Sequence, residues 1–512
     1  GGLALGIAAL GLTLWLGVIA VVGLILSRAQ IRSLADAHAN LEAKERTRGE
    51  ARVDALYQAV LWGAALLLFA ALPVLLATTL GLGAGVIWGI FAMSYISVKL
   101  VLVVGIGTVL ALYGLVRGLF VSRPPQAGKA LTRAEEPELY RVLDQVAAAA
   151  RSHPVDLVIL QPGPGVGVYE EGSTLAVLSG RGKRVLALGY GVLSHLSVGE
   201  LCAVLAHEFG HFSHGETRLT PVLWRVEASS VQMLMGMAAS GKVVMFNPAF
   251  WFLRWYVKVY LRISRGQGRR RELLADRVAA LSYGGETFAR ALTRVSEASE
   301  DLSRAVALLG ALRKAGVGAS AGSLYQLQDL KRAQTAAPLR AALTAEREGR
   351  SPNRYDTHPP DAERIARVAG IRGSRLDDRS AAVSLLARPE QSAIELAALV
   401  LKRLPDPDPA MPRPARSADE VVQALSALQD AHGSCRHGLP GSLALLESAL
   451  EGLSAALGPE HPFLADQLRE LAAARRGDGD EAGAQAALDR AEKIDAGEAR
   501  RKTAQREAAP NP

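Results

Sequence analysis

The long uncharged stretches at the start of the chain constrain its fold more than any other feature. Residues 1–27 carry no charged side chain, and residues 55–98 carry none either. A helix needs only about 20 consecutive apolar residues to cross a bilayer. The rest of the 512-residue chain is ordinary soluble sequence rich in Ala, Leu, Arg and Glu. We therefore expect a membrane anchor at 1–120 that precedes a soluble body.

We expect three spans in this anchor, at about 3–27, 56–77 and 86–117. The alternative for the first span is a cleaved signal peptide, but its apolar stretch is longer than such a peptide requires. The sequence TTLGLGAG at 78–85 predicts a turn between the second and third spans. Lys99 interrupts the third span, and we expect its amine to extend toward the headgroups. Alternatively, 84–98 lies at the interface and the third span covers only about 99–117.

The charges between the spans predict the side on which the soluble body lies. The loop at 28–55 contains six Arg or Lys residues, whereas the 78–85 turn contains none. Four more basic residues follow the third span: Arg117, Arg123, Lys129 and Arg133. Because basic loops stay in the cytoplasm, we expect the N-terminus outside and the soluble body facing the cytoplasm. A bacterial inner membrane is the expected location.

Charge and cysteine content argue against two other classes of protein. The net charge is +8, but no basic stripe is interleaved with aromatic residues as nucleic-acid binding requires, so we expect no nucleic acid partner. Much of the excess lies beside the apolar spans, which favours contact with membrane lipid. Cys202 and Cys435 lie far apart in the sequence, so we expect no disulfide framework and a reducing compartment.

We expect residues 121–404 to form an α+β, mainly helical domain. A helical pattern of apolar residues follows Pro137. Short β-like runs, separated by Gly- and Pro-rich turns, predict a small sheet at 157–160, 174–178 and 185–188. Ser197 and Glu200 have the spacing of a capping box, in which each side chain accepts a hydrogen bond from the other residue's backbone amide. This pattern predicts a helix from about 198 to 213.

That helix carries a metal-binding pattern, HEFGH at 207–211. His207 and His211 are four residues apart, so both imidazoles project from one helix face and can bind one zinc ion. Glu208 can then act as general base toward a water that the zinc activates. A chance match on a surface helix is the alternative, because a bare HExxH pattern is only moderately specific.

A catalytic zinc site usually has three protein ligands and one open position. The sequence ELLAD at 272–276 supplies the third, because Glu272 and Asp276 lie on one helix face. We expect Glu272 to bind the metal and Asp276 to accept a hydrogen bond from the second nitrogen of a ligand histidine. Two alternatives are a solvated acidic face and ligation by His214, which would place three ligands on one straight helix.

These motifs resemble those of the HtpX-like and CaaX-prenyl-endopeptidase-like membrane zinc metallopeptidases. The resemblance rests on HEFGH, on ELLAD and on the sequences at 135–146 and 189–216, and it covers about 130–375. It implies a zincin-type domain with one zinc ion per chain. It also implies that His358 and Arg364, in an HP-containing motif, stabilise the oxyanion or cap the metal. The alternative is that Pro359 and Pro360 only begin a helix and that Arg364 is solvated.

The resemblance has one departure and one variable segment. The family often has an Asn-Ala pair on the strand before the motif helix, where this chain has GVGV at 165–168. Residues 246–262 form the variable segment, because some relatives have full spans there. Here Arg254, Lys258 and Arg262 are four residues apart among aromatic residues, which favours an amphipathic helix at the membrane interface. A core helix with an exposed basic edge is the alternative.

The C-terminal part begins with a Pro-rich linker at 405–416. The helical segment 417–496 resembles a tetratricopeptide repeat of the kinesin-light-chain type, and a plain helical hairpin is the alternative. Such repeats bury their faces by stacking, so this segment would dock on the body or on a protein partner. The charged tail at 497–512 is expected to be disordered.

Together these patterns predict a membrane-bound zinc endopeptidase that hydrolyses peptide bonds of membrane or membrane-proximal proteins. The resemblance implies a role in protein quality control, and prenyl-CaaX processing is the narrower enzymatic alternative. A catalytically silent scaffold that binds partners through its C-terminal helices is the rival from another class.

Overall fold

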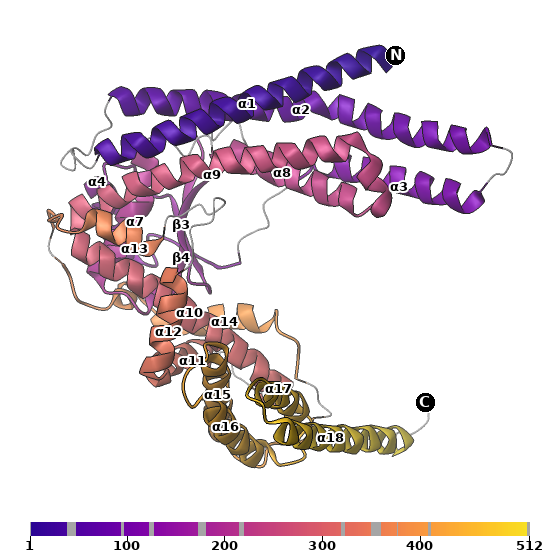
Figure 1. Cartoon of the computed structure of the whole chain (residues 1–512). Helices are drawn as coiled ribbons and strands as arrows, with labels where there is room; N and C mark the ends of the chain where they lie inside the picture. The colour runs from indigo at the N-terminus through magenta and orange to yellow at the C-terminus, as the bar shows by residue number, and fades with distance from the viewer. Residues whose placement is uncertain are drawn as a thin grey trace.

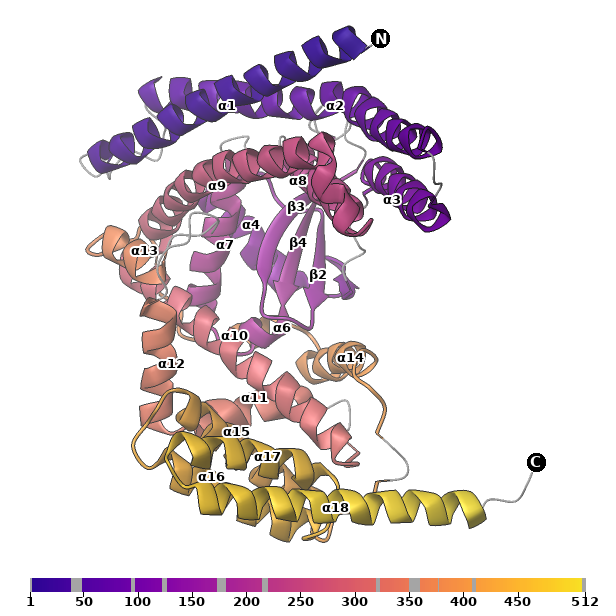
Figure 2. The same ribbon diagram turned by 45° about the vertical axis from the view of Figure 1, so that its right-hand side comes forward.

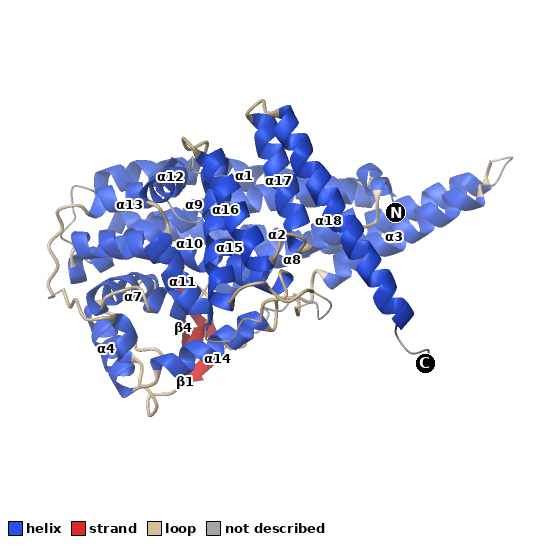
Figure 3. Cartoon of the chain, turned by 90° about the horizontal axis from the view of Figure 1, so that it is seen from below, coloured by secondary structure: helices blue, strands red, loops and turns tan. Residues whose placement is uncertain are grey.

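The computed structural model describes residues 2–37, 48–93, 97–121, 127–172, 181–213, 220–318, 323–349, 360–375, 377–407 and 411–508. The chain is mostly helical, and its strands form one small sheet (Figure 3). Helix α1 (Gly2–Ala37) lies at one end of the molecule and helix α18 (Glu481–Ala508) at the other (Figure 1). The expected α+β, mainly helical fold is confirmed.

Among the described residues, three helices are long and apolar enough to cross a membrane. They are α1, α2 (Arg48–Phe91) and α3 (Val98–Arg117), with apolar stretches at Gly6–Gly23, Ala55–Phe91 and Val98–Arg117. Their outward faces carry many large apolar side chains, as contact with lipid requires. The sequence therefore predicted the number of membrane helices correctly.

The turn expected at 78–85 is wrong, because α2 continues through it as a helix. The hydroxyl of Thr78 donates to the carbonyl of Val74 one turn earlier, as helical Thr residues do. Gly83 serves close packing rather than a turn: a Cβ there would lie 2.3 Å from the hydroxyl of Thr108 on α3. The third apolar helix begins at Val98 rather than near 86, close to the start given by the alternative prediction. That alternative placed 84–98 at the interface, whereas residues 84–91 continue α2.

A second set of helices packs along this anchor. Helix α8 (Thr220–Ala238), the short 3₁₀ helix η3 (Lys242–Phe246) and the first half of α9 (Pro248–Tyr283) share one hydrophobic core with α1, α2 and α3. Helices α8 and α9 lie between the α1–α2 pair and the sheet (Figure 2). Gly236 of α8 and Gly114 of α3 meet backbone to backbone, because a Cβ on Gly114 would lie 2.5 Å from the carbonyl carbon of Gly236.

The sheet has four strands in the order β1-β2-β4-β3, and β3 is its outer strand on one side. The strands are β1 (Lys129–Leu131), β2 (Leu157–Gln161), β3 (Val166–Glu171) and β4 (Lys183–Gly189). Strands β2 and β4 are parallel, and the two outer pairs are antiparallel. The predicted runs 157–160 and 185–188 are therefore strands. The run 174–178 lies outside the described residues, and GVGV at 165–168 enters β3.

Helices surround this sheet and form the main hydrophobic core. They are α4 (Pro137–Ala149), α6 (Tyr190–Leu193), α7 (Val198–Ser213), α10 (Gly285–Lys314), α11 (Ser323–Gln334), α13 (Asp361–Val368), η4 (Ala382–Leu385) and α14 (Pro389–Leu401). Helix α12 (Ala337–Gly349) lies outside this core. The second half of α9 also belongs to this core, because Val278, Ala279 and Ala280 pack into it. One helix thus enters both cores of the protein.

The C-terminal helices dock on the catalytic body. They are α15 (Ala418–Arg436), α16 (Ser442–Leu457), α17 (Phe463–Gly477) and α18. The fully buried Lys331 of α11 donates to the backbone and hydroxyl of Ser426 and pairs with Asp430, both on α15. The guanidinium of Arg313 on α10 donates to three carbonyls near the start of the Pro-rich linker, those of Leu401, Leu404 and Pro405. The linker is therefore fixed to the body at this end.

The expected disorder of 497–512 is wrong over most of that tail, because α18 continues to Ala508. Its polar residues are mainly Arg, Lys, Glu and Gln, which are good helix formers despite their polarity. A polar composition therefore did not distinguish a solvated helix from a disordered chain. Residues 509–512 lie outside the described residues.

Candidate metal centre

A capping box fixes the start of α7, the helix that carries the HEFGH sequence. The amide of Ser197 donates to Glu200 Oε2 (2.9 Å), and the amide of Glu200 donates to Ser197 Oγ (3.3 Å). The Glu200 carboxylate is fully buried and forms an ion pair with Arg294 of α10 at 2.8 Å. The capping box predicted from the sequence thus also holds α7 against α10.

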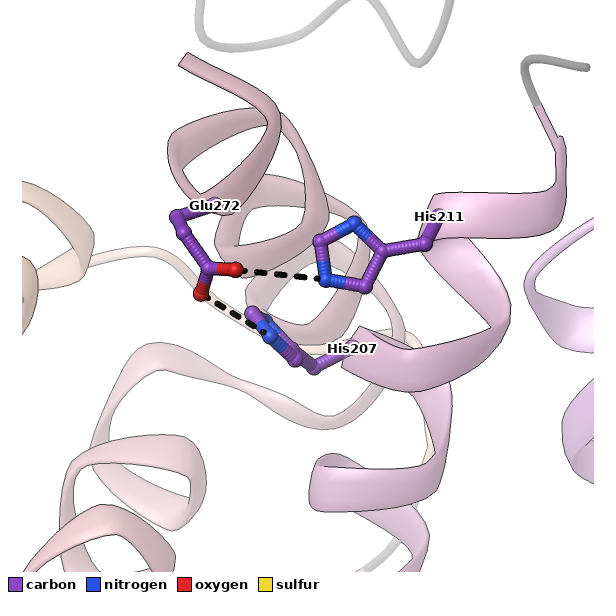
Figure 4. Close-up of side chains that lie close together, drawn as sticks. All are labelled: His207, His211 and Glu272. Atoms are coloured by element: carbon purple, nitrogen blue, oxygen red, sulfur yellow. Dashed lines mark ion pairs between the residues drawn. The ribbon is translucent and has the colours of Figure 1, made fainter. Parts of the chain in front are cut away.

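Helices α7 and α9 cross in close contact beside the histidines. A Cβ on Gly210 would lie 3.1 Å from the Cα of Ala275, so the small residues at both positions allow this approach. The crossing brings the imidazoles of His207 and His211 to the carboxylate of Glu272 (Figure 4). Two helices separated in the sequence therefore supply the three candidate donors.

The donor atoms converge on one point. His207 Nε2 lies 3.4 Å from Glu272 Oε2, and His211 Nε2 lies 3.6 Å from Glu272 Oε1. One ligand atom from each residue lies within 4.8 Å of the others. His207 and Glu272 are buried, and His211 is half-buried. This arrangement has the composition and the one-sided access of a catalytic zinc site.

A second layer of residues orients the ring of His207. Asp276, one turn after Glu272, places Oδ1 2.8 Å from His207 Nδ1. This contact directs Nε2 of the same ring toward Glu272. The ring of Phe288 on α10 stacks on the imidazole, with 5.8 Å between the ring centroids and 21° between the planes. The pattern ExxxD therefore has the geometry expected from the sequence.

Arg364 of α13 lies behind this layer. Its guanidinium donates to both oxygens of Asp276, at 2.9 Å from Nε and 2.6 Å from Nη2, and Nη2 lies 3.7 Å from Glu272 Oε2. The side chain is buried, which excludes the alternative of a solvated arginine. The structure therefore places Arg364 against the carboxylate of Asp276 and close to that of Glu272.

The pKa values of the ionisable groups in the site depend strongly on one another. Burial opposes the charged form of His207, yet the hydrogen bonds to Asp276 and Glu272 raise the pKa of its imidazole to about 10. Burial, and then the nearby His207, lowers the pKa of His211 to about 3. Burial would raise the pKa of Asp276, but the hydrogen bonds from Arg364 and His207 lower it. The two carboxylates thus favour a cation between Glu272 and the imidazoles.

The structure describes only some of the remaining predicted residues. Glu208 is half-buried on α7, directly after His207. His358 and His214 lie outside the described residues. Sequence reasoning missed Phe288, because an apolar residue inside a helix carries no signal of a stacking role. It also missed the pairing of Arg364 with Asp276, which depends on contacts between residues 88 positions apart.

Comparison with known proteins agrees with this geometry. Residues 133–372 match the profile of Peptidase family M48, and this range contains all the residues of the candidate centre. Over this range the chain is similar to peptidase family M48. Protease HtpX homolog 1 of Streptomyces coelicolor is 31% identical to the chain over 189 residues, which cover 33% of this chain and 57% of the relative. The match thus spans little more than half of the relative's length. No solved structure matches the chain.

Family M48 consists of zinc metallopeptidases, so the similarity to it is a further reason to expect a metal at these donors. The residues fit such an ion. Two imidazole nitrogens and a carboxylate form the donor set that catalytic zinc uses in many peptidases. The electrostatics fit as well, because the site already draws a proton to His207, and a divalent cation would replace it.

Proposed function

We propose that the protein is a membrane-bound, zinc-dependent endopeptidase with one zinc ion per chain. His207, His211 and Glu272 would hold the ion. The observation that carries this proposal is the convergence of their three donor atoms within 4.8 Å at the crossing of α7 and α9. When bound, zinc would act as a Lewis acid that lowers the pKa of a water molecule and polarises the scissile carbonyl.

The chain's own residues would orient the site and move the proton. Asp276 keeps His207 in the tautomer that directs Nε2 toward Glu272. Arg364 holds both oxygens of Asp276 and so positions that carboxylate. Glu208 would take the proton from the attacking water and then deliver it to the leaving amine. His358, by the family resemblance, would stabilise the developing oxyanion.

The sheet supports binding of an extended substrate. Strand β3 is the outer strand beside β4, and it packs against α7. An outer strand has unpaired backbone groups that can bind a further strand. A substrate segment that paired with β3 would lie along the motif helix. The GVGV sequence at the start of β3 would give this edge little side-chain selectivity of its own.

We infer that the substrates are membrane or membrane-proximal proteins, cleaved in protein quality control. The support is the attachment of the M48-like domain to three apolar helices and its similarity to a protease of the HtpX type. The basic loops favour a catalytic domain that faces the cytoplasm, at a bacterial inner membrane. Processing of prenylated CaaX proteins is the narrower alternative. The non-enzymatic alternative is a catalytically silent scaffold that binds partners through residues 417–496.

Substitution Glu208→Gln tests the proposal. The amide cannot accept the proton, whereas the three proposed ligands are unchanged. We expect peptide hydrolysis to fall by roughly two or more orders of magnitude, with the zinc content of the purified protein unchanged. Substitution of the exposed Glu363 by Gln is a matched control. Near-normal turnover by Glu208→Gln would remove this residue from the mechanism, and absence of zinc from the wild-type protein would favour the scaffold.

A further inference from the structure

The hairpin of α8, η3 and α9 exposes a group of large apolar side chains. Phe246 is 80% exposed, Trp255 is 55% exposed, Met245 is 49% exposed and Trp251 is 37% exposed. They lie next to the membrane helices, because the same hairpin shares the core of α1, α2 and α3. Exposed groups of this kind mark contact with a partner or with a membrane.

Cations flank the same face of α9. The guanidinium of Arg254 lies 5.1 Å from the ring centroid of Trp251, and the amine of Lys258 lies 4.9 Å from that of Trp255. Arg262 follows one turn later and is also exposed. Within the described part of the chain, no carboxylate forms an ion pair with these cations. The face therefore combines tryptophan with unneutralised positive charge, as residues at a membrane interface do.

Contacts with α3 indicate how deep the hairpin would reach. Gly118, directly after α3, lies against Met233 of α8, whereas Gly114, one turn earlier in α3, lies against Gly236. Later residues of α8 therefore contact earlier residues of α3. Because α3 is the third apolar helix and ends at Arg117, the chain moves into the bilayer as α8 approaches η3.

The same contacts limit this depth. From Met233 to the end of α8 at Ala238 the helix rises about 8 Å, and half of the hydrocarbon layer is about 15 Å thick. By this register against α3, the hairpin would enter one leaflet without crossing it. A complete span would place Arg254 and Lys258 in hydrocarbon, where charges are costly.

We propose that this hairpin is a membrane wedge with a binding site for anionic phospholipid headgroups. Met245 and Phe246 lie among the acyl chains of the leaflet in which α3 ends. Trp251 and Trp255 lie at the interface, and Arg254 and Lys258 bind phosphate. Lys242, at the start of η3, is the exposed charge nearest the tip, and its long side chain reaches back toward the headgroups.

Quenching of tryptophan fluorescence by brominated lipids tests this site in the full chain, reconstituted in liposomes. A variant that retains only Trp251 and Trp255 is made by four Phe substitutions, at Trp15, Trp62, Trp88 and Trp224. We expect stronger quenching by brominated phosphatidylglycerol than by the same fraction of brominated phosphatidylcholine. The added substitutions Arg254→Gln and Lys258→Gln should make the quenching by the two brominated lipids equal. The reason is that each cation enriches anionic lipid about five-fold at low salt.

Two controls separate charge from structure. Arg254→Lys should keep the preference for the anionic lipid, and Gln substitutions of Lys493 and Arg500 on the distant α18 should have no effect. In a background without other Trp residues, Phe246→Trp should be quenched most by bromines placed deeper than those that quench Trp251 and Trp255. Equal quenching by both lipids, or none by either, would overturn the proposal; quenching of Phe246→Trp greatest at the bilayer centre would replace the wedge by a span. None of these measurements depends on peptidase activity.

Discussion

The two halves of α9 have the same charge spacing but opposite surroundings. In the first half, Arg254, Lys258 and Arg262 are four residues apart and exposed. In the second half, Glu272 and Asp276 are also four residues apart, yet both are buried. The first half packs its apolar face on the membrane helices, whereas the second half packs on α7 and α10.

This difference shows what a charge pattern can and cannot indicate. A spacing of four places residues on one helix face wherever it occurs. Whether that face is buried depends on the charges that other segments bring to it. Here Arg364 and His207 neutralise the acids of the second half. The first half receives no such partner from the described residues, and its charged face stays on the surface.

The sharpest test of the buried half is removal of its proposed ligand. Glu272→Ala should lose both zinc and peptidase activity, because two imidazoles alone leave the ion without its anionic ligand. His214→Ala should keep most of both and is the matched control. Zinc content by atomic absorption, together with peptide hydrolysis, measures the outcome. The reverse result would assign the third ligand to His214.

A smaller effect is expected from the residue behind the histidine. Asp276→Asn keeps the size of the side chain but removes the charge shared by Arg364 and His207. Loss of such a supporting group lowers metal affinity by about 10- to 100-fold. Competition with a zinc-binding dye measures the change, with the exposed Asp419→Asn as control. Unchanged affinity would show that Arg364 and Asp276 serve folding alone.

The smallest effect is expected in the first half of α9. The hydroxyl of Tyr256 donates to the carbonyl of Ala64 on α2 at 2.8 Å and is buried. Tyr256→Phe should destabilise the protein by about 1 kcal/mol and leave its zinc content unchanged. Thermal unfolding in detergent measures the loss of stability, and metal analysis measures the zinc content, with Trp255→Phe as control. Loss of zinc in Tyr256→Phe would show that a change in the first half of α9 alters the proposed metal site in its second half.

Local patterns predicted most of the candidate site. Helical spacing placed His207 and His211 on one helix face and Glu272 and Asp276 on another, and the structure brings the two pairs together. The role of Arg364 could not be derived in this way, because its pairing depends on how α13 packs against α9. Residues within one or two helical turns are thus predictable, whereas contacts between distant segments require the fold.

Glycine was the least predictable residue in the fold. The Gly-rich sequence at 78–85 is equally compatible with a turn and with close packing of two helices. Only the position of Thr108 on α3 shows that Gly83 serves packing. The predicted disorder of the C-terminal tail failed for a related reason, because composition alone does not reveal a helix that exposes most of its surface.

The position of Glu272 after the membrane-side half of α9 has a consequence for biosynthesis. A ribosome completes α1, α2, α3 and the whole of the HEFGH sequence before it reaches residue 272. A nascent chain that ends before α9 therefore has both histidines and Glu208 but lacks the proposed third ligand. The order of synthesis would thus delay assembly of the proposed metal site until the helix that joins the anchor to the sheet-containing core has been made. A nascent chain that has not yet reached residue 272 would therefore be expected to be inactive while it is inserted among other membrane proteins.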